Sequence, residues 1–305
     1  MCFRLFIISG FVIAGCMNEN NLIGNIENMS CEKAIGVLDS LAFNNSDFFV
    51  DDNFMRYKYA NCLGEYERYE EGVHQMLVYL EAQPRDLNAK MILGHFYSAL
   101  GETEKAKAIF LEVHKIDSKY PNVNYNLAVT FIELKYFDYA LKYIDRQIEL
   151  VENPDFETQL LRCEILTKLK NWNDAASCYQ AIPYSEFDFW GMKDYSLAMK
   201  ALNKVEEAEQ FLINLALHHP EQYEIFNELA FISLEIEKYE RTEAYLEKSK
   251  SIESDTVVNP EMYLAYAALF GAKNQKDSCC LILNSLSFTE FSSFGIENLR
   301  KECCD

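Results

Sequence analysis

Cysteine is the residue type whose spacing in this chain points most directly to chemistry. The sequence contains 10 cysteines, and eight of them follow Cys16: Cys31, Cys62, Cys163, Cys178, Cys279, Cys280, Cys303 and Cys304. In an oxidising compartment these thiols can pair. We expect disulfides between the adjacent pairs Cys279-Cys280 and Cys303-Cys304, because such bonds would fasten the end of the chain onto the preceding helices. A zinc site from the same four thiols is the alternative, although neither pair has the usual ligand spacing.

Another cysteine ends the first stretch of the chain, which reads MCFRLFIISGFVIAGC. Arg4 precedes an apolar run of ten residues, from Leu5 to Ala14. A membrane-spanning helix needs about twenty apolar residues. The run therefore has the length of the central part of a secretory signal peptide instead.

The residues before the thiol, Ile13-Ala14-Gly15-Cys16, resemble the bacterial lipobox. In that motif a peptidase cuts after small side chains, and the cysteine thiol takes up a diacylglycerol. The resemblance implies a signal peptide over residues 1–15, a lipid on Cys16 and a flexible tether over 16–29. Each buried CH₂ of an acyl chain contributes about 0.8 kcal/mol, so a diacyl or triacyl anchor holds stably.

Met17 follows this cysteine, and by analogy with enterobacterial sorting it favours the outer membrane over retention at the inner one. We therefore expect a protein of the bacterial envelope that meets the membrane through its lipid anchor only. Two alternatives remain open at this stage. One is an ordinary signal peptide in which Cys16 is incidental, and the other is a buried N-terminal helix.

Signatures of enzymes are missing from the sequence: it has no Gly-rich phosphate loop, no H-E-x-x-H and no nucleophile elbow. Its histidines are His74, His95, His114, His218 and His219. His218-His219-Pro220 closes a helix, where the helix dipole favours a histidine. We expect no catalytic residue, no metal and no cofactor.

Composition and charge narrow the class of protein further. Half of the 305 residues are hydrophobic, which is enough for a large core, and the sparse glycine (11) and proline (6) favour helix over an all-β fold. The formal net charge of −20 disfavours nucleic acid as a partner, because phosphates would repel the chain. Where this charge has a binding role, it suits a basic partner.

Most of the sequence consists of a motif that repeats about every 34 residues and that must position the cysteines and histidines named above. Its clearest copy, LNAKMILGHFYSALGETEKAKAIFLEVHKIDSKY, covers 87–120. Gly94 and Ala106 are the small residues at positions 8 and 20, where two helices of a hairpin approach closely. Leu93, Tyr97 and Phe110 are the large residues at positions 7, 11 and 24, which fill the space between stacked hairpins.

These positions are the signature of the tetratricopeptide repeat, and the chain resembles that family from residue 53 to about 291. Copies begin near residues 53, 87, 121, 156, 189, 223 and 260. The resemblance implies an all-α, right-handed superhelical solenoid of about seven helix-turn-helix repeats. Residues 30–52 are predicted to form an N-terminal capping helix and loop, and 292–305 a C-terminal cap. The stretch 182–191 is the expected bend within one continuous superhelix, and Cys163, at position 8, is interpreted as a small packing residue.

The resemblance also implies a concave face made by the first helix of each repeat, at positions 2, 5, 9 and 12. The candidate groove residues are Tyr57, Asn61, Met91, His95, Asn122, Tyr125, Trp190, Lys193, Asn227 and Phe231, with acids at Glu157, Glu164 and Glu224. Some relatives bind a C-terminal carboxylate through lysine and asparagine in their first repeats, but here Tyr57 stands where that lysine would be. The groove suits a protein or peptide ligand with apolar anchors and some positive charge.

These features predict a non-enzymatic, lipid-anchored envelope protein that binds a protein or peptide in its groove, as a scaffold or assembly factor. A narrower alternative is a pilotin-like or pilus-assembly lipoprotein, which resembles this chain in its anchor and its repeats. A different class, an enzyme subunit whose site the repeats hide, is the third possibility.

Overall fold

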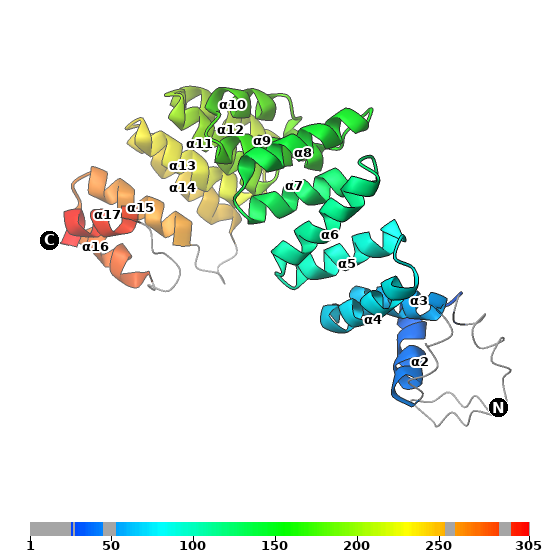
Figure 1. The fold of residues 1–305 in the computed structure, drawn as a ribbon. Helices are drawn as coiled ribbons and strands as arrows, with labels where there is room; N and C mark the ends of the chain where they lie inside the picture. The colour runs from blue at the N-terminus through cyan, green and yellow to red at the C-terminus, as the bar shows by residue number, and fades with distance from the viewer. Residues whose placement is uncertain (1–25, 27, 45–52, 254–259, 287–293, 305) are drawn as a thin grey trace. The chain divides into compact units, whose positions relative to one another are not determined.

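The computed structural model describes residues 26, 28–44, 53–253, 260–286 and 294–304 (Figure 1). In these ranges the chain forms sixteen α-helices and one 3-10 helix, and no strand. A first helix, α2 (Cys31–Asn44), is followed by seven hairpins and a last helix, α17 (Phe294–Cys304). The hairpins are α3 (Asn53–Glu65) with α4 (Tyr69–Ala82), α5 (Leu87–Ala99) with α6 (Thr103–Ile116), α7 (Val123–Glu133) with α8 (Phe137–Leu150), α9 (Phe156–Lys168) with α10 (Trp172–Gln180), α11 (Phe189–Ala201) with α12 (Val205–His218), α13 (Tyr223–Glu235) with α14 (Tyr239–Ile252), and α15 (Pro260–Ala272) with α16 (Lys276–Ser285). The prediction of an all-α array of about seven hairpins with terminal helices is confirmed.

Each hairpin turns through one residue with a left-handed backbone. These residues are Glu67, Gly101, Lys135, Lys170, Asn203, Glu237 and Asn274. At the turn after α5, the Glu102 N–H donates to the Tyr97 carbonyl at 2.8 Å and the Gly101 N–H donates to the Ser98 carbonyl at 2.9 Å. This bond pair ends a helix through a left-handed residue, a conformation that glycine adopts without strain. The sequence period therefore corresponds to a turn repeated with the same geometry.

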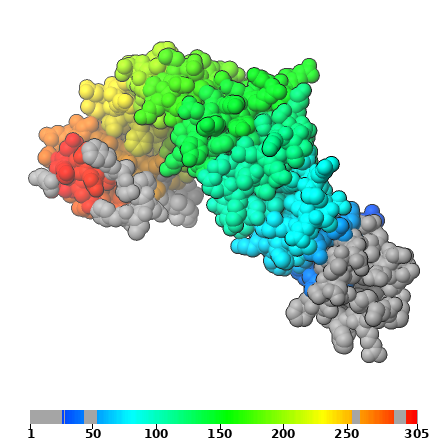
Figure 2. All heavy atoms as spheres, viewed as in Figure 1, coloured from blue at the N-terminus to red at the C-terminus, as the bar shows by residue number. Residues whose placement is uncertain are grey.

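Small residues let the helices approach, as the spacing predicted. A Cβ on Gly94 would overlap the ring of Phe110, which is buried in the second helix of the same hairpin. A Cβ on Gly72 would stand 2.8 Å from the ring of Phe96, in the next hairpin. Side chains thus fill the space between neighbouring helices, and glycine at positions 72 and 94 sets the spacing within and between hairpins. In the space-filling view, successive parts of the chain pack against one another (Figure 2).

The chain divides into two compact units, Met1–Leu150 and Val151–Asp305. The first unit begins with a cluster in which α2 packs on α3 through buried side chains such as Leu38, Met55 and Leu63. The division falls at 150/151, whereas the sequence interpretation kept one superhelix with a bend at 182–191.

The stretch 182–191 packs against the core of the second unit through some of its side chains. Ile182 and Phe187 are buried with Tyr195 and Phe211, whose rings lie 4.0 Å apart, and the Phe187 and Phe211 rings lie 5.0 Å apart. The Tyr184 carbonyl accepts a hydrogen bond from His219 Nε2 at 2.7 Å. These contacts hold the stretch against α12, so its proline ends a helix without dividing the unit.

Disulfides connect neighbouring helices in both units. Cys31–Cys62 joins α2 to α3, Cys163–Cys178 joins α9 to α10, and Cys279–Cys303 and Cys280–Cys304 both join α16 to α17. All the cysteines in the described ranges are bonded in this way. Cys163 is therefore more than a small packing residue, because it is buried and also bonded across its hairpin.

Candidate functional site

The predicted groove residues lie on, or directly before, the first helices of the hairpins. We call the surface that these residues mark the first-helix face of each unit. In the first unit the face comes from α3, α5 and α7, and in the second from α9, α11, α13 and α15. Each of the two compact units thus has a first-helix face of its own.

In the first unit, Tyr57 is half-buried and held by the following hairpin. The Asn88 amide donates to the Tyr57 hydroxyl, and the rings of Tyr57 and Tyr79 lie 5.2 Å apart. The Tyr79 hydroxyl donates to Asp86 at 2.7 Å, and the same carboxylate caps α5 by accepting from the Ala89 N–H at 3.0 Å. Burial, helped by this carboxylate, raises the pKa of Tyr79 to about 12, so its hydroxyl remains a donor. The result is a fixed aromatic surface with polar atoms.

His95 of α5 is exposed on the same face. Its Nε2 lies 2.9 Å from the Asn126 amide nitrogen, and its ring meets Phe110 edge-on at 5.6 Å. Because an amide N–H can only donate, Nε2 accepts and Nδ1 carries the proton. Desolvation by the surrounding protein lowers the pKa of His95, which favours the neutral ring. A neutral His95 can offer its Nδ1–H to a partner.

The remaining predicted residues of the first unit differ in their exposure. Asn61 and Tyr125 are half-buried, and Asn122 is exposed directly before α7 with a φ of 58°. Met91 is buried, so it contributes to packing rather than to contact with a partner.

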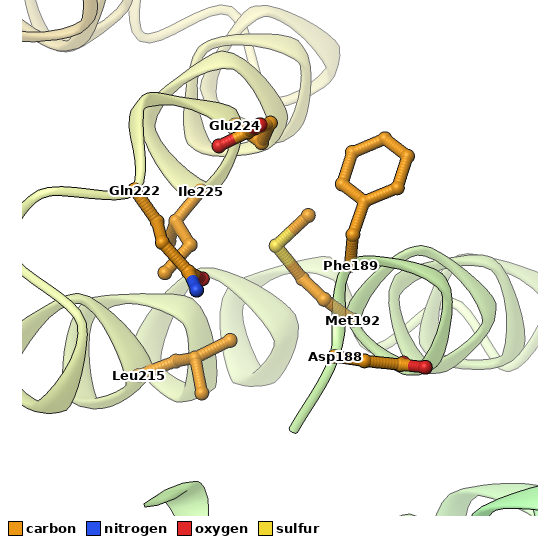
Figure 3. A pocket seen from close by; sticks show the side chains of 7 residues that line it. All are labelled: Asp188, Phe189, Met192, Leu215, Gln222, Glu224 and Ile225. Carbon is orange, nitrogen blue, oxygen red and sulfur yellow. The ribbon is translucent and has the colours of Figure 1, made fainter. Parts of the chain in front are cut away.

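In the second unit, the first-helix face contains a cleft where α11 begins, α12 ends and α13 begins (Figure 3). Its volume is about 110 Å³, and its lining residues are Asp188, Phe189, Met192, Leu215, Gln222, Glu224 and Ile225. Met192, Leu215 and Ile225 form an apolar floor, and Asp188 and Glu224 stand on opposite sides of it (Figure 3). We call this site the α11–α13 cleft.

Sequence reasoning named only one residue of this lining, Glu224. It missed the others because periodicity groups residues along one helix, while the cleft forms where three helix ends meet. One local signal was available. Asp188 stands directly before the apolar start of α11, and its Oδ1 accepts from the Gly191 N–H at 2.6 Å as a helix cap.

The predicted residues Trp190 and Lys193 lie beside the cleft. Trp190 is 69% exposed, and its ring lies 5.1 Å from that of Phe189. The Lys193 ammonium lies 4.6 Å from the Phe189 ring centre and pairs with Glu261 of α15. An aromatic residue of the cleft therefore already contacts a cation from the chain itself.

Asn227 and Phe231 occupy the inner side of α13. Asn227 is only 1% exposed, and its Oδ1 accepts from the Ser249 hydroxyl of α14 at 2.7 Å. Phe231 is half-buried against the cluster that α13, α14 and α15 form. Asn227 therefore packs the array, whereas Phe231 keeps part of its ring open.

Carboxylates with raised pKa values are grouped on the first helices of the second unit. Burial is the main cause of the raised pKa of Glu164 on α9, Asp194 on α11 and Glu228 on α13. Lys168 opposes the effect for the first two, at 3.8 Å from Glu164 and 4.0 Å from Asp194. Partly desolvated carboxylates are stabilised in the ionised form by positive charge, which Lys168 supplies to Glu164 and Asp194.

Two further features bear on chemistry. Among the described residues, no group of three or more His, Cys, Asp or Glu side chains is placed to hold a metal ion. None of the helices in the described ranges combines the length and the apolar character needed to cross a bilayer. The predicted signal peptide and the lipidation residue Cys16 lie outside the described residues.

Comparison with known proteins identifies the repeat and the fold. Residues 87–120 match a family model described as tetratricopeptide repeat. No curated protein matches the sequence significantly.

Three solved structures share the fold at low sequence identity. A tetratricopeptide repeat protein from Parabacteroides merdae ATCC 43184 is 16% identical with a TM-score of 0.63, over 83% of this chain and 99% of that chain. The Pseudomonas aeruginosa pilF protein is 15% identical with a TM-score of 0.54, over 71% of this chain and 97% of that one. A chain of the APC/C hetero-tetramer Cut9-Hcn1 is 12% identical with a TM-score of 0.56, over 94% of this chain and 55% of that one. At these identities the likeness concerns the fold, which is that of a tetratricopeptide array.

Proposed function

We propose that this chain is a lipid-anchored scaffold of the bacterial envelope that holds a protein or peptide partner on the first-helix faces of its units. The observation that carries the proposal is the surface chemistry of these faces. They present half-exposed aromatic rings, amides and carboxylates, and the second unit adds a preformed apolar cleft. Stacked hairpins bury their own core, so aromatic and apolar groups left open on one face are available for a partner.

The proposed location rests on two features of the cysteines. The lipobox-like residues 13–16 place a thiol where an acyl chain would be attached. The eight described cysteines form four disulfides, a bonding state typical of proteins in oxidising compartments. Both features favour export, and the lipobox-like residues favour anchoring in the envelope. Met17, directly after Cys16, favours the outer membrane.

Substitution of Cys16 tests the anchor. In the proposed state, Cys16→Ala releases the protein from the membrane fraction and abolishes lipid labelling. Cys2→Ala is the matched control, because Cys2 lies inside the predicted signal peptide and would be removed with it. Membrane fractionation and lipid labelling that are the same in wild type and Cys16→Ala would contradict the anchor.

Capture of partners from the native envelope tests the scaffold. After crosslinking, the tagged protein is purified and its partners are identified by mass spectrometry, with a Trp190→Ala, His95→Ala double variant as comparison. The proposal expects specific envelope proteins that the wild type enriches and the double variant loses. Equal recovery from both would show that the first-helix faces do not hold the partner.

A pilus-assembly lipoprotein is the second candidate. The observation in its favour is the fold shared with almost the whole Pseudomonas aeruginosa pilF chain. Deletion of the gene in its own host should then abolish pilus or secretin assembly, and complementation should restore it. Normal assembly after deletion would exclude this candidate and leave the general scaffold proposal intact.

A further inference from the structure

We propose that the α11–α13 cleft binds an aliphatic side chain of a partner peptide that also carries a lysine or arginine close to that side chain. The inference rests on the proposed function, because it gives the chemistry of the partner at the first-helix face of the second unit. It commits to one occupant, a peptide segment with one apolar anchor and adjacent positive charge.

The floor of the cleft determines the anchor. Met192, Leu215 and Ile225 are almost fully buried and turn apolar atoms toward the space (Figure 3). The volume of about 110 Å³ is smaller than the cavity of about 150 Å³ that accepts benzene in another protein. A leucine, isoleucine or methionine side chain fits a space of this size, whereas an indole does not.

The rim determines the charge of the partner. The N-terminal ends of α11 and α13 carry partial positive charge, but Asp188 and Glu224 each place a full negative charge there. Asp188 uses Oδ1 to cap α11, at 2.6 Å from the Gly191 nitrogen, and its second oxygen can accept from a partner. The net charge at the rim is therefore negative, and a basic side chain complements it.

The exposed aromatic residue next to the rim favours the same partner. Trp190 is 69% exposed and touches Phe189, which lines the cleft. Tryptophan is the ring that attracts cations most strongly, and Trp190 is largely exposed beside the acidic rim. The formal charge of −20 on the chain also increases the rate at which a basic segment arrives.

A random linear peptide library displayed on phage and selected on the immobilised full chain tests the proposal. Enriched sequences are then synthesised, and their Kd values are measured against four variants. Asp188→Asn with Glu224→Gln removes the rim charge, while asparagine keeps the oxygen that caps α11. Asp155→Asn is the matched control, because Asp155 caps α9 in the same way, at 2.7 Å from the Thr158 nitrogen.

The other two variants test the cleft itself. Gln222→Trp fills it from an exposed position at its edge, so the core is left unchanged. Gln83→Trp, at an exposed helix end of the first unit, is its control. Circular dichroism melts of all four variants separate lost binding from lost folding.

The expected result is enrichment of peptides with an aliphatic residue near lysine or arginine. Their Kd should rise about tenfold or more in the rim variant and in Gln222→Trp, and stay unchanged in both controls. Peptides that bind equally well to Gln222→Trp would overturn the cleft assignment and leave the proposed function standing. Enriched peptides without positive charge would overturn it as well. Failure of the library to yield any binder would overturn this inference, while the proposed function would still be decided by the capture of envelope partners.

Discussion

Lys193 of α11 forms an ion pair with Glu261 of α15, although three helices, α12, α13 and α14, separate α11 from α15 in the sequence. The side chains are 30% and 32% exposed. The pair therefore connects the second and the fourth hairpins of the second unit along its first-helix face, beside the α11–α13 cleft.

We predict that this pair contributes little to stability. Exposed ion pairs contribute about 0.2–1 kcal/mol, because water screens the charges and two long side chains lose freedom. A double-mutant cycle with Lys193→Met and Glu261→Gln, measured by urea unfolding, should give a coupling energy of about 0.5 kcal/mol that falls at high salt. The pair Lys273 and Glu243, 2.9 Å apart, serves as the control cycle. A coupling of several kcal/mol would mean that the pair is a structural lock.

Replacement by alanine should change stability in opposite directions at two glycines, Gly94 and Gly36. Gly94→Ala places a methyl group against the buried Phe110 ring, and such overpacking costs about 1–3 kcal/mol. Gly36→Ala in α2 meets nothing within 4 Å and should stabilise the helix by about 0.5–1 kcal/mol. Thermal unfolding of both variants checks the prediction. A Gly94→Ala variant as stable as the wild type would show that Phe110 moves aside freely.

The repeat register is the part of the fold that could be predicted from the sequence. The spacing of Leu93, Gly94, Tyr97 and Phe110 gave the helix pairs, because residues three and four apart share one side of a helix. The same rule placed Tyr57, His95 and Lys193 on surfaces that the structure leaves partly open.

The non-local relationships could not be predicted in this way. The position of Asn227 within its repeat predicts a groove residue. In the structure it is buried, and its Oδ1 accepts a hydrogen bond from Ser249 of the next helix. The α11–α13 cleft depends on how three helix ends meet, which no periodicity records. Disulfide partners are also beyond spacing alone, since several cysteines allow many pairings.

Removal of the Cys163–Cys178 disulfide should destabilise the second unit. The bond closes 15 residues between two helices of one hairpin, a loop for which the entropy lost by the unfolded chain corresponds to about 3 kcal/mol. The variant with both cysteines replaced by alanine should lose about that much in denaturant unfolding. Reduction of the wild type should cost more than this, because it also opens the other three disulfides. The variant should therefore lose less on reduction than the wild type does.

Peptide mapping by mass spectrometry without reductant provides the independent check. It should recover the four linked pairs Cys31–Cys62, Cys163–Cys178, Cys279–Cys303 and Cys280–Cys304. Free thiols at Cys163 and Cys178 in protein purified from the envelope would contradict both the stability prediction and the proposed compartment.

The pH dependence of stability should show the effect of Glu228. This carboxyl is buried in α13, and burial raises its pKa despite the nearby ammonium groups of Lys200 and Lys193. The pKa of an unfolded glutamate is about 4.3. Between that value and the raised folded pKa the folded chain binds more protons than the unfolded chain, so the contribution of Glu228 to stability falls as pH rises through this window.

Glu228→Gln isolates this contribution, because the amide has nearly the same shape and does not ionise in this range. The free energy of unfolding of the wild type, minus that of the variant, should be constant below the unfolded pKa. It should decrease as pH rises from the unfolded to the folded pKa, and become constant again above the folded pKa. NMR titration of ¹³C-labelled glutamate side chains gives the folded pKa directly. A folded midpoint at or below that of the unfolded chain would contradict the prediction, since Lys193 and Lys200 would then outweigh burial.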